Sequence, residues 1–140
     1  LRMYTVDAAG VYHILEFATE NTWTIDLASF HKKIPSRFNI DALEETVVLR
    51  IKYADLIHIY INAPKFDKIF RVLLENNYMI LQDRIGQLFS LTAEERYHLF
   101  IENYPHLINR ISQVQIAAFL GVTPQFLSMI RSRLANGSNH

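Results

Sequence analysis

The chain of 140 residues is long enough for one ordinary domain or two small ones, and 50% of its residues are hydrophobic. It has no cysteine, which excludes a disulfide framework, a thiolate zinc finger and a cysteine-ligated iron–sulfur centre. Its 14 basic and 14 acidic residues balance, and its apolar runs are far shorter than the roughly 20 residues of a membrane helix. We therefore expect a globular cytoplasmic protein with no membrane partner.

The first third of the chain has the alternating, β-branched pattern of strands. The predicted strands are residues 1–6, 11–17, 38–42 and 46–51. The sequence DAAG at residues 7–10 predicts a hairpin turn between the first two strands. Glu44 and Glu45 predict a polar turn before the last strand, which has the sequence TVVLRI.

The rest of the chain has a helical period. A short helix over residues 54–62 is expected to break at Pro64, and a long helix follows over residues 65–89. Thr92 with Glu95 and Ser112 with Gln115 have the spacing of capping boxes, so each pair predicts the start of a further helix. Thr123 and Pro124 suit the N-cap and first position of a last helix, which is expected to reach about residue 135.

The long helix carries two apolar stripes, although a lone surface helix needs only one. One stripe contains Phe66, Ile69, Leu73 and Ile80. The second stripe is predicted to pack against the same helix of a second subunit, with a polar asparagine fixing the register. The predicted dimerisation residues are Phe70, Leu74, Asn77, Leu81 and Leu88. The alternative is a central helix buried within one monomer.

Residues 113–132 (QVQIAAFLGVTPQFLSMIRS) have the spacing of a DNA-binding helix-turn-helix. Ala117 allows two helices to cross closely, and Gly121 permits a left-handed turn between them. A small core is expected from Ile116, Leu120, Val122, Leu127 and Ile130. Residues 110–140 contain three arginines and no acidic residue, which favours DNA over a helical bundle that binds protein. The predicted DNA contacts are Thr123, Pro124, Gln125, Ser128, Met129, Arg131 and Ser132.

These patterns together resemble the Crp/Fnr transcription regulators, in particular a subgroup common among Bacteroidetes. The resemblance is carried by TIDLASF at residues 24–30, IDALE at residues 40–44, Pro64, AEER at residues 93–96 and Tyr104 with Pro105. It implies an α+β fold whose parts are a partial double-stranded β-helix (jelly-roll), a long dimerisation helix and a helix-turn-helix domain. Their expected bounds are residues 1–63, 64–89 and 90–140. It also implies that the first half of the β-roll is missing before Leu1.

The resemblance implies an effector site, from which this sequence departs at three places. The Gly-Glu-Leu turn of members that bind cyclic AMP becomes Ile25, Asp26 and Leu27. The Arg-Ser-Ala that pairs with the phosphate becomes Ser36, Arg37 and Phe38, which shifts the arginine by one residue and so to the other face of a strand. The Thr-Ser pair that contacts the purine becomes Leu81 and Gln82. We therefore expect no binding of cyclic AMP, and either another effector or none.

The recognition helix departs from the family as well. Pro124, Gln125 and Met129 stand where cyclic-AMP-type members have Arg, Glu and Arg. Gln125 suits adenine edges and Met129 suits a thymine methyl group, so a site richer in A·T pairs is predicted.

Other chemistry has little support in the sequence. His13, His31 and His58 stand apart from one another and from the spacings of metal ligands. Asp26, Glu44 and Glu45 are acidic residues without a nucleophile or phosphate-binding motif beside them. We therefore expect no enzyme, metal or cofactor.

The function expected from the sequence is a dimeric, sequence-specific regulator of transcription that binds double-stranded DNA. RNA polymerase is a further partner that this function allows. The alternative is a protein-interaction module built on a degenerate β-roll dimer.

Overall fold

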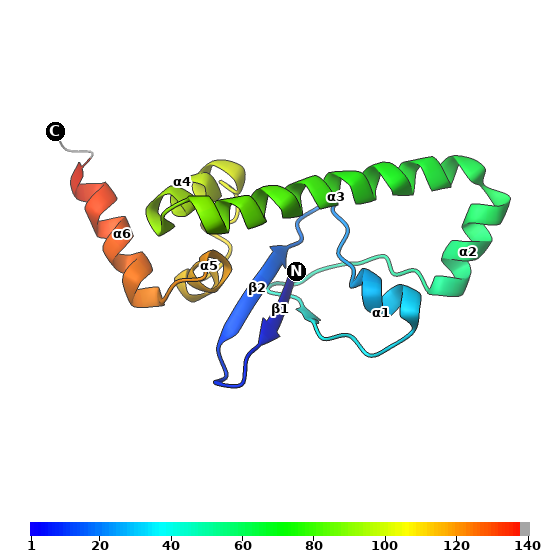
Figure 1. Cartoon of the computed structure of the whole chain (residues 1–140), viewed down its shortest axis with the longest axis horizontal. Helices are drawn as coiled ribbons and strands as arrows, with labels where there is room; N and C mark the ends of the chain where they lie inside the picture. The colour runs from blue at the N-terminus through cyan, green and yellow to red at the C-terminus, as the bar shows by residue number, and fades with distance from the viewer. Residues whose placement is uncertain (138–140) are drawn as a thin grey trace.

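A computed structural model describes residues 1–137 of the chain and shows a mixed α+β fold (Figure 1). The strands and helices are, in chain order, β1 (Arg2–Val6), β2 (Tyr12–Phe17), α1 (Leu27–Lys32), β3 (Asn39–Asp41), α2 (Tyr53–Asn62), α3 (Pro64–Ser90), α4 (Ala93–Asn103), α5 (Gln113–Leu120) and α6 (Pro124–Gly137).

The long helix α3 extends along the molecule and connects its two ends (Figure 1). At one end lie α1 and α2, and at the other lie α4, α5 and α6. The small sheet lies beside α3, and its strand β2 packs against α5. The sheet therefore contacts the C-terminal helices directly.

The sheet has the antiparallel order β2-β1-β3. The predicted hairpin between β1 and β2 is confirmed, because Asp7 Oδ1 accepts hydrogen bonds from the backbone N–H of Ala9 and of Val11, both at 2.9 Å. Gly10 completes the turn with a φ of 81°, a conformation that glycine adopts without strain. On the other edge, Arg2 donates to both oxygens of Asp41, at 2.8 and 2.9 Å, and this bidentate pair stabilises the register of β3 against β1.

The strand predicted at residues 46–51 is wrong, because these residues form neither strand nor helix. The side chains of Val47 and Leu49 are 97% and 102% exposed. A β-branched run forms a strand only when another strand pairs with its backbone and one of its faces is buried. None of the strands at residues 2–41 lies beside this segment to provide either.

Helix α1, which has six residues, was not predicted from the sequence. Asp26 caps it by accepting the backbone N–H of Ser29 at 3.1 Å, and Lys33 ends it in the left-handed conformation. A helix this short has too few turns to show an apolar period, so its cap was the only sequence signal.

The other helices begin and end close to their predicted bounds. Pro64 is the first residue of α3, where a missing N–H costs nothing. Both predicted capping boxes are confirmed: Thr92 and Glu95 exchange hydrogen bonds at 2.7 and 3.3 Å, and Ser112 and Gln115 do so at 2.8 and 3.3 Å.

Two apolar clusters stabilise the fold. The larger one joins β2 to the C-terminal helices, and its buried members are Ile14, Phe17, Tyr97, Phe100, Leu107, Ile116, Ala117, Leu120, Leu127 and Ile130. The smaller one is aromatic and joins α2 to α3, with Phe70 in contact with Trp23, Tyr60 and Phe66 at ring-centroid distances of 5.8 to 6.5 Å. The sheet and α4–α6 therefore share one core.

Within residues 1–137, no single helix is long and apolar enough to cross a membrane. Only α5 and α6 taken together pass such a test of length and composition, and the two are bent by 100° relative to each other.

Candidate nucleic-acid interface

Helices α5 and α6 cross at a short turn that contains the glycine predicted there. Gly121 ends α5 with φ 71° and ψ 34°, which confirms the expected left-handed conformation. The N–H of Val122 donates to the carbonyl of Ala117 at 3.0 Å, and Thr123 Oγ1 accepts the N–H of Phe126 at 3.2 Å. The two helix axes differ in direction by 100°, within the range of about 90–120° found in helix-turn-helix motifs.

The core predicted for this pair of helices is present. Ile116, Leu120, Leu127 and Ile130 are buried, as is the small Ala117 at the crossing. Val122 is half-buried and packs against the same cluster. These contacts fix the rotation of α6 about its axis, and hence the face that it presents to solvent.

That outward face of α6 contains the residues predicted to contact bases. Successive helical residues turn by about 100°, so the buried Leu127, Ile130 and half-buried Leu134 define the inner side. The opposite side consists of Gln125, Ser128, Met129, Ser132 and Asn136, and all five are exposed. Thr123, Pro124 and Arg131, the other predicted contacts, are exposed as well.

Two arginines flank this outward face on opposite sides. Arg131 was among the predicted contacts, whereas Arg133 was missed, although both are exposed. The helical period places Arg133 one turn after Met129, so spacing alone was a sufficient signal. The first turn of α6 carries no acidic residue, and the face is therefore polar with positive edges.

Arg110 does not contribute to this positive surface, contrary to the sequence analysis. It lies in the connection between α4 and α5 and forms ion pairs with Glu20, at 2.7 Å, and with Glu44. Glu44, which was predicted only as part of a polar turn, therefore also forms an ion pair. Arg110 lowers the pKa of Glu20 to about 2, because its hydrogen bonds stabilise the ionised carboxylate. These pairs neutralise Arg110 and attach the connection to the segments that flank the sheet.

No protein-family model matches this chain, and no curated protein matches it either.

The structure brings some of the predicted effector residues together and leaves another apart. Ser36 Oγ donates to Asp26 Oδ2 at 2.7 Å, and Arg37 is close enough to help lower the pKa of Asp26, after the larger effects of the Ser36 and backbone hydrogen bonds. Leu81 is exposed on α3. Neither of the two cavities described for residues 1–137 is lined by Ile25 or by any of these residues.

The predicted dimer surface of α3 needs one correction. Phe70 is 6% exposed and lies in the aromatic cluster of its own chain, so it is not accessible to a second subunit. Leu74 is half-buried, whereas Asn77, Leu81 and Leu88 are exposed. Apolar residues at alternating steps of three and four define a slightly rotated seam, formed by the half-buried Leu74 and the exposed Tyr78, Leu81, Ile85 and Leu88.

Arg84 faces the core of its own chain and connects three elements. Its Nη2 donates to the carbonyl of Ile14 in β2 at 2.7 Å and to that of Phe119 in α5 at 2.8 Å. Its guanidinium lies 3.8 Å from the centre of the Phe119 ring. Burial lowers the pKa of Arg84 to about 10, so the side chain is still charged at neutral pH.

The histidines and acidic residues form no group of three that could hold a metal ion within residues 1–137. His13 is nevertheless not isolated, because its Nε2 lies 2.8 Å from Asp7 Oδ2 across the hairpin. His58 contacts Asn62 one turn later on α2. Asp26 caps α1 and is therefore occupied in a structural role.

Proposed function

We propose that the protein is a dimeric, sequence-specific DNA-binding regulator of transcription in which α5 and α6 are a helix-turn-helix and α6 is the recognition helix. The observation that carries this proposal is the outward face of α6, defined above, on a helix whose rotation is fixed by buried residues. Such a face fits the major groove, which admits one α-helix.

The side chains on α6 suit both base and phosphate contacts. Gln125 can donate and accept at an adenine edge, and Met129 can contact a thymine methyl group, so a site rich in A·T pairs is proposed. Ser128 and Ser132 add hydrogen-bonding groups on the same face. Arg131 and Arg133 flank the face at the positions where the two phosphate backbones pass, and Thr123 lies at the N-terminus of the helix, where phosphate is favoured.

A dimer through the α3 seam supplies the two-fold symmetry that such regulators use. Apolar residues with heptad spacing favour a pair of helices that coil around each other, and we propose that this pair is parallel. Two recognition helices related by this axis would stand about 34 Å apart, one turn of DNA, and would contact a palindromic site.

The N-terminal part is proposed to be related to the jelly-roll sensor domain of the Crp/Fnr type. The motifs at residues 24–30 and 40–44, together with the position of α3 after them, support this proposal. Because three expected contacts differ, its effector would be a molecule other than cyclic AMP.

The dependence of DNA affinity on salt tests this proposal. Each phosphate contact releases counterions, so the slope of log affinity against log salt should fall by about 0.9 when one contact is removed. We expect Arg131→Ala and Arg133→Ala each to weaken binding to duplex DNA in fluorescence anisotropy and to flatten this slope. Arg71→Ala, which removes an exposed arginine from α3, should change neither. A chain that binds no duplex at low salt would contradict the proposal.

One observation favours the second candidate, a protein-interaction module. Met129 and Phe126 are 51% and 42% exposed on α6, and exposed apolar side chains are common at protein interfaces. A module of this kind would bind its partner with little dependence on Arg131 and Arg133, and its affinity would change little with salt.

A further inference from the structure

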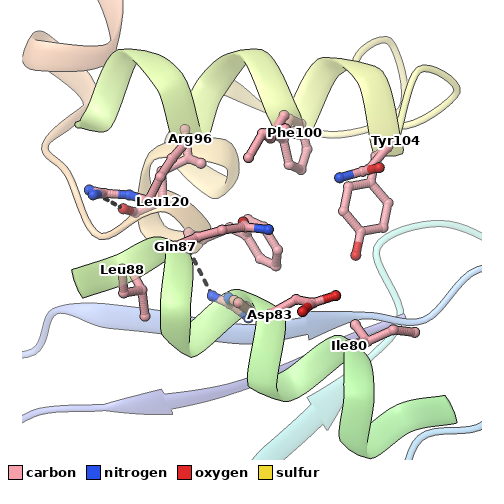
Figure 2. Close-up of a pocket in the computed structure, with 12 residues that line it drawn as sticks. Ile80, Asp83, Gln87, Leu88, Arg96, Phe100, Tyr104 and Leu120 are labelled. Atoms are coloured by element: carbon pink, nitrogen blue, oxygen red, sulfur yellow. Dashed lines mark hydrogen bonds between the residues drawn. The ribbon is translucent and has the colours of Figure 1, made fainter. Parts of the chain in front are cut away.

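A cleft of about 370 Å³ separates α3 from α4 and α5 (Figure 2). Side chains of α3 and α4 point toward one another across it, with Asp83 and Gln87 on one wall and Phe100 and Tyr104 on the other. Its volume is at the lower end of the range of about 300–1,000 Å³ for small-molecule sites. The cleft is therefore large enough for a molecule that consists of an aromatic ring and a polar substituent.

The positive and negative groups at the cleft are equal in number. Arg84, Arg96 and Asp83 line it. Glu16 in β2 supplies the second negative charge, because it and Arg84 lie close enough for each to affect the pKa of the other, although burial has the larger effect on both. Both arginines already donate to backbone carbonyls. A charged ligand would lose its hydration without meeting a net opposite charge, so the cleft favours a neutral ligand.

Three neutral polar side chains that line the cleft have no hydrogen-bond partner within residues 1–137. They are the carboxamides of Gln87 and Asn103 and the hydroxyl of Tyr104. Asn103 is exposed, whereas Gln87 is half-buried, so a hydrogen bond to Gln87 would be better shielded from water. A carboxamide has an N–H donor beside a carbonyl acceptor in one plane. It can therefore form two parallel hydrogen bonds with a ligand that has a donor and an acceptor on one edge, as a primary amide does.

An aromatic wall lies beside these polar groups. The rings of Phe100, Tyr104 and Phe119 contact one another at centroid distances of 5.3 to 6.0 Å. Leu99 and the exposed Ile80 also line the cleft. An aromatic body would cover apolar surface here and could pack against the rings in the offset or edge-on geometry that aromatic pairs prefer.

We propose that the cleft between α3, α4 and α5 binds a small, neutral aromatic molecule that carries a primary amide or a lactam. The amide edge pairs with the carboxamide of Gln87, and the ring packs against Tyr104 and Leu99. This binding does not depend on the proposed recognition of DNA, so each can fail without the other.

An NMR titration of the whole chain tests the proposal with benzamide as the probe. N,N-Dimethylbenzamide is one control, because it keeps the ring and the carbonyl but has no N–H donor, and benzoate is the charged control. We expect saturable binding of benzamide with a Kd below about 10 mM, which is reasonable for a ligand of this size. The affinity should be about fivefold higher than for either control, since each lacks a hydrogen bond to Gln87.

A variant of Gln87 should change which ligand is preferred. Gln87→Glu replaces the carboxamide by a carboxylate, which only accepts hydrogen bonds and pairs with the planar cation of benzamidine. We expect the unmodified chain to prefer benzamide, and Gln87→Glu to bind benzamidine about tenfold more tightly than benzamide. Gln82→Glu adds the same charge at an exposed position of α3 and should keep the preference for benzamide. Leu99→Trp fills the cleft and should abolish binding of both molecules.

The comparison of probes on the unmodified chain needs no variant, so it decides even if a variant fails to fold. The absence of saturable benzamide binding, or equal affinity for benzamide and N,N-dimethylbenzamide, would overturn the proposal. A folded Gln87→Glu chain that still prefers benzamide would overturn it as well. Full affinity in Leu99→Trp would place the ligand elsewhere on the chain, which also contradicts the proposed site.

Discussion

At the scale of residues, three arginines join segments that are far apart in the sequence. Arg2 joins β1 to β3, and Arg84 joins α3 to both β2 and α5. Arg110 joins the connection between α4 and α5 to Glu20 and Glu44. The planar guanidinium suits this role, because its donors reach two acceptors at once.

The Arg110 pairs predict a dependence of stability on pH. The pKa of Glu20 is about 2 in the folded chain, below its ordinary value of 4.5, so its contribution is complete above pH 4.5 and is lost as pH falls toward 2. We expect Arg110→Gln to lower the urea midpoint at pH 6 and to lower it much less at pH 3. Arg131→Gln, at an exposed position, should leave the midpoint unchanged at both values. If Arg110→Gln lowered the urea midpoint equally at pH 6 and pH 3, the ion pair of Arg110 with Glu20 would not be the source of the stability.

Two glycines predict alanine effects of opposite sign. Gly121 has a φ of 71°, whereas Gly86 lies within α3, and a Cβ at either position would meet nothing within 4 Å. Because space for a Cβ is available at both positions, the backbone conformation alone determines whether alanine stabilises or destabilises the fold. We expect Gly121→Ala to cost about 1 kcal/mol of unfolding free energy and Gly86→Ala to add about 0.5–1 kcal/mol. Denaturant titrations of the two variants measure this, and a gain in Gly121→Ala would refute the left-handed turn.

Some site residues were predictable one by one and others were not. Ala117 and Gly121 were identified because a helix crossing requires small residues at a fixed spacing, and that spacing is local in the sequence. The pairing of Arg110 with Glu20 spans 90 residues. A composition count assigned Arg110 to the positive surface, since no local pattern shows which distant carboxylate neutralises a charge.

At the scale of elements, the exposed seam on α3 predicts a dimer. Heptad-spaced apolar residues that stay exposed in one chain have a strong tendency to pair. We expect the chain to sediment as a dimer at micromolar concentration. Leu81→Glu combined with Ile85→Glu should give monomers, because two charges would be buried in the seam. Asn76→Glu lies on the other side of the helix and serves as the control. A wild-type chain that is monomeric at this concentration would contradict the prediction that the α3 seam forms a dimer.

Helices were predicted more accurately than strands for a physical reason. The hydrogen bonds of a helix are local. Pro64 and the caps at Thr92 and Ser112 therefore mark the first residues of three different helices, α3, α4 and α5. A strand depends on a partner that lies elsewhere in the sequence. Residues 46–51 have the composition of a strand but no partner among the described strands, and composition alone did not reveal this.

At the scale of the whole molecule, the order of the main parts was predictable but their packing was not. The strand-rich beginning, the long central helix and the helical end all follow from periodicity. The core that joins Ile14 and Phe17 of β2 to α4–α6 was not expected. The inward direction of Phe70 and Arg84 was not expected either. The heptad spacing of α3 fits two overlapping apolar seams, and only the contacts of α3 with the rest of the chain show which seam is exposed.

The most direct test of the proposed function is a selection of random duplex DNA on the 140-residue chain. If α6 is a recognition helix in a two-fold dimer, the selected sequences should converge on a palindrome with half-sites one turn apart and rich in A·T pairs. Gln125→Ala should relax the preference at one position of each half-site while leaving the others. Recovery of no enriched sequence, or of a motif that Gln125→Ala leaves unchanged, would contradict the account.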